Sequence, residues 1–273
     1  MAKPKKVVFV ACRVCNLRLQ GKELGQHILQ AHKDTAWRQY AQVYLERMWF
    51  GQGQLDRRLV EKFRDTVTCE MLHDLFVKYG VIRTVPGDGV ARLKAFAEML
   101  NSYRDTPMTK ETISSIVERE VASMREVYGK GPLSAITKSF WMMKQHPVVI
   151  YDTNTWEGLW RRGLAPGYNR YGTYFDSWFK FFEEPETQTG LDDALNWLPD
   201  APAVKQLVED AQKDALKDGL EVTAEKERLV AEEIKTLAAS QLMRNRVTDM
   251  RLFYEGGGFL EDSLSCNHAE TCS

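Results

Sequence analysis

The chain has 273 residues, a hydrophobic fraction of 44% and a formal net charge of −1 at pH 7. This size and composition allow one large domain or two modest ones, with a core that needs no disulfide support. The near-neutral charge argues against a protein that coats nucleic acid without specificity. No apolar run approaches the roughly 20 residues needed to cross a bilayer, and the first residues do not resemble a signal peptide. We therefore expect a soluble, cytoplasmic protein with no membrane partner.

The first strong pattern in the chain is a set of four metal-ligand residue types. Cys12, Cys15, His27 and His32 follow the spacing C-x2-C-x11-H-x4-H. Two thiolates from a β-turn and two imidazoles one helical turn apart can surround a zinc ion tetrahedrally. The spacing predicts a structural Zn²⁺ site in a small ββα finger over residues 1–35, which resembles the C2H2 zinc fingers.

The predicted finger lies in a basic part of the chain. Residues 1–47 contain nine lysines and arginines against three acids. Arg13, Arg18 and Lys22 are therefore candidates for contact with DNA, although one finger could read only about three base pairs. The alternative is a finger that only stabilises the N-terminus or docks on a partner.

The rest of the chain has helical periodicity. Apolar residues recur at steps of three and four over residues 37–50, 59–80, 90–100 and 112–129. Further helices are expected over residues 171–184 and 192–198, with a loop over residues 185–190 between them, and a long helical segment is expected from about 203 to 254. This pattern predicts an all-α body over residues 36–260, without internal repeats. Residues 261–273 are polar and small and are expected to be a flexible tail. Metal binding by Cys266, His268 and Cys272 is the less favoured interpretation of that tail.

A second distinctive stretch, SAITKSFWMMKQHPVVIYDTNTW, covers residues 134–156. A helix-like segment with Lys138 breaks at Pro147, and an apolar VVIY run then ends in Asp152. The motifs of nucleotide hydrolysis, dinucleotide redox chemistry and the common hydrolases are absent from the sequence.

This stretch, extended to GPLSAITKSFWMMKQHPVVIYDTNTWEGL, resembles the signature region of the helix-hairpin-helix DNA glycosylases. That superfamily includes endonuclease III, the adenine glycosylase and the 8-oxoguanine glycosylase. The segment RVTDMRLFYEGGG also resembles the C-terminal helix of a bacterial subgroup with the 8-oxoguanine-glycosylase fold, some of whose members occur near phage-defence genes. The resemblance implies a glycosylase-like helical body and a double-stranded DNA partner that carries a modified base.

The resemblance further implies that Lys138 and Asp152 are the catalytic pair of a DNA N-glycosylase, with or without lyase activity, in repair or phage defence. Lys144 is the alternative for the family lysine. A carboxylate in a poorly hydrated site can stabilise the positive charge that develops on the sugar, and a lysine with a lowered pKa can attack C1′.

A flipped base needs aromatic side chains to hold it. Candidates occur in the right part of the chain: Trp141, Tyr151, Trp156, Tyr171, Tyr174 and Trp178. For any single one of them, packing in the core is the favoured alternative.

The charged residues also have structural interpretations. Asp152 could cap the helix that follows it, which is compatible with catalysis. Lys138 could be an exposed helix lysine, and Arg246 and Asp249 are expected to form an internal ion pair across one turn. For the whole protein, the alternatives are a non-catalytic DNA-binding or regulatory protein on a glycosylase scaffold, and an all-α protein whose finger contacts protein.

Overall fold

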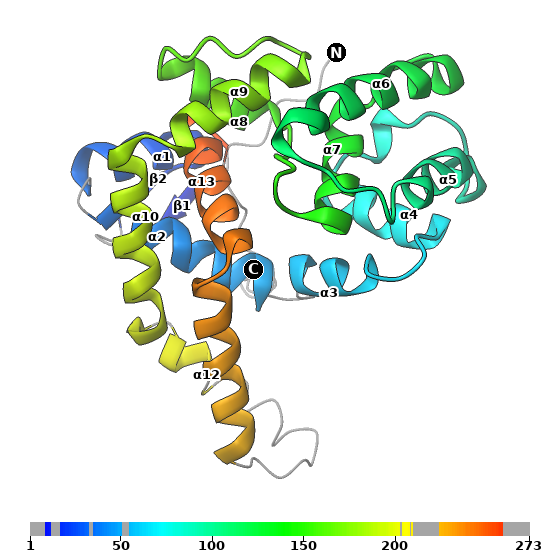
Figure 1. Ribbon diagram of the computed structural model, residues 1–273. Helices are drawn as coiled ribbons and strands as arrows, with labels where there is room; N and C mark the ends of the chain where they lie inside the picture. Colours follow the sequence, from blue (N-terminus) through cyan, green and yellow to red (C-terminus); the bar gives the residue numbers. More distant parts are fainter. Residues whose placement is uncertain are drawn as a thin grey trace, which may run out of the picture.

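The computed structural model describes residues 9–11, 17–32, 35–50, 55–202, 204–207, 209 and 224–258. This part of the chain is almost entirely helical, which confirms the predicted all-α class (Figure 1). Within the described segments, no helix combines the length and the apolar character needed to span a bilayer.

The elements follow one another with short connections. The N-terminal unit is β1 (Phe9–Ala11), β2 (Arg18–Gln20) and α1 (Gly21–Ala31), with the two strands antiparallel. The next elements are α2 (Ala36–Tyr44), the π-helical turn η2 (Leu45–Trp49), α3 (Leu55–Lys62), α4 (Cys69–Lys78), η3 (Ile82–Thr84), η4 (Ala91–Leu93) and α5 (Lys94–Ser102). The last are α6 (Lys110–Tyr128), α7 (Leu133–Lys144), α8 (Thr153–Arg161), α9 (Tyr171–Phe182), α10 (Pro185–Trp197), η5 (Leu198–Asp200), α12 (Ala224–Ala238) and α13 (Gln241–Glu255).

Helix boundaries follow from capping residues. Thr68 accepts a hydrogen bond from the Met71 amide at the start of α4, and Thr109 caps α6. Gly129 ends α6 in the left-handed conformation, at φ 69°. Ser240 caps α13, so the long helical segment expected from about 203 to 254 is broken before its last helix.

Helix α13 is the central element of its half of the molecule. In Figure 1 it runs between α8 and the pair α2 and α10, while α3 to α7 lie on the other side of the view. Two glycines let neighbouring helices reach its backbone. A Cβ atom on Gly158 of α8 would lie 2.3 Å from the Leu252 carbonyl oxygen, and one on Gly25 of α1 would lie 2.0 Å from that of Tyr254. Because any side chain would clash there, both helices pack against α13 at backbone contact.

The core contains many aromatic side chains. The largest fully buried ones are Trp141, Trp178, Tyr40, Tyr44, Tyr171 and Tyr174. Leu24 and Ile28 of α1 belong to the same core. The helix of the predicted finger is therefore packed onto the helical body.

Candidate active site

The segment between α7 and α8, residues 145–152, is non-helical and pairs with no strand in the part of the chain that the structure describes. Its backbone is instead satisfied by side chains from neighbouring helices. The Tyr171 hydroxyl accepts a hydrogen bond from the Val149 amide and donates one to the Val149 carbonyl, both at 3.0 Å. The Tyr174 hydroxyl donates to the Ile150 carbonyl at 2.7 Å, and the Thr137 hydroxyl accepts from the Tyr151 amide at 3.0 Å. Buried backbone polar groups need such partners, so this segment has a fixed position.

Asp152 follows directly and caps α8. Its Oδ1 atom accepts a hydrogen bond from the Asn154 amide at 2.9 Å, which confirms the capping interpretation. Its Oδ2 atom lies 3.5 Å from the Lys138 Nζ atom, and 31% of the side chain is exposed. Capping uses one oxygen and leaves the other directed at the lysine.

Lys138 is buried within α7, with 3% of the residue exposed, so its interpretation as an exposed helix lysine is wrong. Its Nζ atom donates to the Ser134 Oγ atom at 2.6 Å. Burial lowers the pKa of the Lys138 ammonium, and the opposing attraction of Asp152 does not cancel that effect. Lys144, the alternative lysine, is half-buried and donates to the Arg104 carbonyl oxygen.

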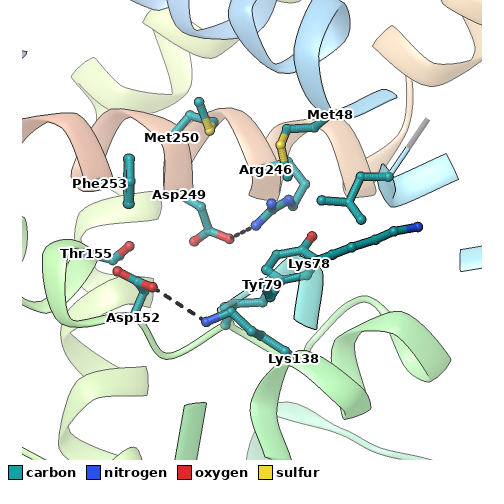
Figure 2. Close-up of a pocket in the computed structure, with 12 residues that line it drawn as sticks. Met48, Lys78, Tyr79, Lys138, Asp152, Thr155, Arg246, Asp249, Met250 and Phe253 are labelled. Atoms are coloured by element: carbon teal, nitrogen blue, oxygen red, sulfur yellow. Dashed lines mark hydrogen bonds and ion pairs between the residues drawn. The ribbon is translucent and has the colours of Figure 1, made fainter. Parts of the chain in front are cut away.

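Lys138 and Asp152 both line a pocket of about 260 Å³ (Figure 2). Its polar lining includes Lys78, Tyr79, Lys138, Asp152, Arg246 and Asp249. Its apolar lining is Met48, Leu55, Ile150, Met250 and Phe253, and Thr155 completes the wall. The volume is slightly below the range typical of small-molecule sites, roughly 300–1,000 Å³. The pocket is therefore of a size for one nucleobase or a similarly small group.

Arg246 is the centre of a second charged group in the same wall. Its Nε atom donates to the Asp56 Oδ2 atom and its NH1 group to the Asp249 Oδ2 atom, each at 3.1 Å. The predicted ion pair between Arg246 and Asp249 is thus present. Asp56 is fully buried and also accepts hydrogen bonds from the hydroxyls of Tyr44 and Tyr79.

The four aromatic residues assigned to base binding, Trp141, Tyr151, Trp156 and Tyr174, are not part of the described lining of the pocket. Trp141 and Tyr174 are buried in the core, as their alternative interpretation predicts. Tyr151 donates to the Asn169 side chain, and the Trp156 indole donates to the Pro166 carbonyl. The role of these residues in the structure is to hold helices and loops around Asp152.

The sequence prediction omitted the aromatic residues that do line the pocket, Tyr79 and Phe253. One signal could have located Phe253. Arg246, Asp249, Met250 and Phe253 follow the spacing i, i+3, i+4, i+7, which places them on one face of a helix. Because the Arg246–Asp249 pair lies on the same face of that helix, the apolar residues beside it were candidates for the pocket wall.

The turn between α6 and α7 is short and contains two glycines. Residues 129–132 read GKGP, so two glycines separate the helices a few residues before Lys138. A Cβ atom on Gly131 would lie 2.8 Å from a methyl carbon of Val121, so a side chain there would force Val121 to move. The chain thus has a tight helix-turn-helix at this point.

The predicted metal and DNA contacts of the N-terminus are only partly described. Cys12, Cys15 and Arg13, and the side chain of Lys22, lie outside the described residues, whereas Arg18 is exposed on β2. The rings of His27 and His32 have centroids 5.1 Å apart. Among the described residues, which leave out both cysteines, no group of three or more metal-ligand side chains occurs.

Comparisons of the chain with protein-family models, with curated proteins and with solved structures found no match.

Proposed function

We propose that the protein is a DNA N-glycosylase that removes a modified or damaged base after the nucleotide has been flipped out of the duplex. One observation carries this proposal: the buried Lys138 amine and the Asp152 carboxylate lie 3.5 Å apart in one small pocket. A lysine with a lowered pKa next to a partly exposed carboxylate is the pair that glycosidic bond cleavage with covalent capture requires.

The chemistry can be written with these two groups alone. As the C1′–N bond lengthens, its electron pair moves to the departing base and positive charge develops on the sugar. The Asp152 carboxylate stabilises that charge. Burial favours the unprotonated form of Lys138, whose lone pair then forms a bond to C1′, and the base leaves with the electrons and takes up a proton from solvent.

Loss of the Nζ protons and opening of the sugar ring would convert this adduct to a Schiff base. Borohydride reduces such an imine to a stable amine, so covalent capture has its own readout. Water activated by Asp152 could instead attack C1′ without an adduct, which is the monofunctional form of the same reaction.

DNA contact outside the pocket is proposed for two places. The first is the GKGP turn between α6 and α7, which lies a few residues before Lys138. The second is the basic N-terminal unit that contains Arg13, Arg18 and Lys22. One face of α1 is packed on α13 through Gly25, so only its remaining surface could reach DNA.

We also propose a structural Zn²⁺ ion held by Cys12, Cys15, His27 and His32. Two imidazoles on one tetrahedral zinc, with Zn–N bonds of about 2 Å, have ring centres about 5 Å apart. The observed 5.1 Å between the His27 and His32 rings supports this geometry. The buried Nε2 atom of His32 has no hydrogen-bond partner among the described residues, as expected of a nitrogen that ligates a metal.

The test is a single-turnover assay for abasic sites on duplexes that each carry one modified base. Asp152→Asn should slow base release at least about 100-fold, the loss typical of removing one electrostatic group from an active site. Lys138→Ala should abolish trapping by borohydride. Lys144→Ala, a matched lysine in the same helix, should behave as wild type.

If no duplex yields an abasic site and the variants bind DNA as the wild type does, the enzyme proposal fails. The non-catalytic DNA-binding protein would then be the better description. If Lys138→Ala still releases base but is no longer trapped, Lys138 acts only in strand cleavage.

A further inference from the structure

Asp249 is a second carboxylate of the same pocket, on the α13 wall across from Lys138 and Asp152 (Figure 2). Both of its carboxylate oxygens accept hydrogen bonds from other side chains. The Trp178 indole N–H donates to Oδ1 at 2.8 Å, and the Arg246 guanidinium donates to Oδ2 at 3.1 Å. Donors from two different helices therefore fix the orientation of this carboxylate.

Each carboxylate oxygen has more than one lone pair, so Asp249 can accept further hydrogen bonds on the side that faces the pocket. Burial raises the pKa of Asp249 to about 6, against the lowering influence of Arg246. At pH 7.5 the group is consequently ionised and can only accept. Its neighbours on α13, Met250 and Phe253, offer no acceptor that could compete with it.

A buried acceptor of this kind discriminates among ligands. A base whose edge presents an N–H group replaces a hydrogen bond to water, whereas a base without that group leaves the pocket-facing lone pairs of the carboxylate desolvated and without a donor. With the sugar at Lys138 and Asp152, the edge of a flipped base would extend toward the α13 wall.

We propose that Asp249 is a specificity-determining residue that selects flipped bases with a ring N–H next to a carbonyl, such as guanine, hypoxanthine or uracil and their lesions. This inference rests on the proposed function, because it assumes that the pocket takes a flipped base. It differs from that function in assigning the choice of base to a residue that takes no part in bond cleavage.

The test uses binding, not turnover, with Asp152→Asn as the parent protein. Duplexes carry guanine, hypoxanthine or uracil, or the counterpart methylated at the ring nitrogen, each opposite a tetrahydrofuran abasic analogue. Neither member of a pair is base-paired in that context, so the cost of flipping does not depend on lost pairing. Affinities are measured by fluorescence anisotropy at pH 7.5.

At least one N–H base should bind about tenfold or more tightly than its methylated counterpart, the discrimination typical of a good contact to a base edge. Adding Asp249→Asn should reduce that preference below threefold. Adding Asp176→Asn, an exposed aspartate on α9, should leave it unchanged. Circular dichroism and thermal melting establish that each variant is folded.

If Asp249→Asn does not fold, Trp178→Phe replaces it, because loss of one of the two donors should weaken the same preference. The inference is overturned if none of the three pairs shows a preference, or if the preference survives these substitutions. A preference for N–H bases without base release would keep this inference and refute the glycosylase. Base release without such a preference would support the glycosylase and overturn this inference.

Discussion

Replacing Lys138 with methionine should make the protein more stable while abolishing its proposed activity. Methionine has nearly the same length but no charge to bury. The groups that Lys138 contacts keep other hydrogen-bond partners when Lys138 is replaced. The Ser134 hydroxyl still donates to the Tyr151 carbonyl at 2.9 Å, and Asp152 keeps its hydrogen bond from Asn154 and its access to water.

The expected gain in stability follows from the cost of burying the Lys138 ammonium, less the attraction of its partners. Burial lowers the pKa of Lys138 in spite of its partners, so the folded environment disfavours the charged form relative to water. Each unit of such a shift corresponds to about 1.36 kcal/mol. We expect Lys138→Met to raise the free energy of unfolding by about 1 kcal/mol at pH 7, within the range found when functional groups are replaced by well-packed ones.

The pH dependence has a definite sign. A lysine in the unfolded chain keeps its proton up to a pH of about 10.4. Folded Lys138 releases its proton at lower pH, so between these two values the unfolded state binds more protons and wild-type stability rises with pH. The methionine variant lacks this contribution. Its advantage should therefore be largest near pH 7 and shrink toward pH 10.

Urea unfolding at pH 7 and pH 9.5 measures the stability gain of Lys138→Met and its change with pH. Both are obtained from the transition midpoints at constant m-value. Lys180→Met, at an exposed position on α9, is the control and should change stability by less than about 0.5 kcal/mol at either pH. If Lys138→Met is less stable than the wild type at pH 7 and the difference does not change by pH 9.5, Lys138 forms a stabilising ion pair, and the argument for a depressed pKa is refuted.

Three further outcomes are expected. Arg246→Met should lower the free energy of unfolding by about 3–5 kcal/mol in urea, because it leaves two buried carboxylates without their cation. Arg244→Met, two residues earlier and paired with an exposed aspartate, should cost about 1 kcal/mol or less. An equal loss of stability from both substitutions would contradict the role of Arg246 in neutralising the buried carboxylates. Gly158→Ala should cost about 3 kcal/mol in thermal melts because its Cβ would meet the Leu252 carbonyl at 2.3 Å. His32→Ala should lose zinc in metal analysis, and full retention would exclude His32 as a ligand.

Most of the helical elements were predictable because they carry local signals, but residues 185–190, expected to be a loop, form the first half of α10. Apolar residues at steps of three and four, together with caps such as Thr109 and breaks such as Gly129, depend only on nearby residues. The same holds for Asp152: a polar residue directly after a buried run and before a helix start has few roles available. Local chemistry therefore located one half of the candidate site.

The remainder of the pocket depends on tertiary contacts. Asp56 and Arg246 are 190 positions apart in the chain, and nothing in either neighbourhood indicates the other. The aromatic residues near Asp152 were assigned to the ligand because of their position in the sequence. In the structure, Tyr171 and Tyr174 donate hydrogen bonds to the backbone of the non-helical segment between α7 and α8. Composition shows that aromatic side chains are present, but only packing determines which of them face the pocket.

The position of α1 connects the N-terminal unit to the site. Gly25 meets the backbone of α13 near its end, and the same helix carries Arg246 and Asp249 in the pocket wall. Leu24 and Ile28 are buried in the common core, so that face of α1 is committed to packing. A metal that rigidifies α1 would therefore also stabilise the end of α13. For the proposed zinc finger, this arrangement favours a structural role in holding α13, which forms a wall of the pocket. Any contact with DNA would then be made by the surface of α1 that is not packed on the core.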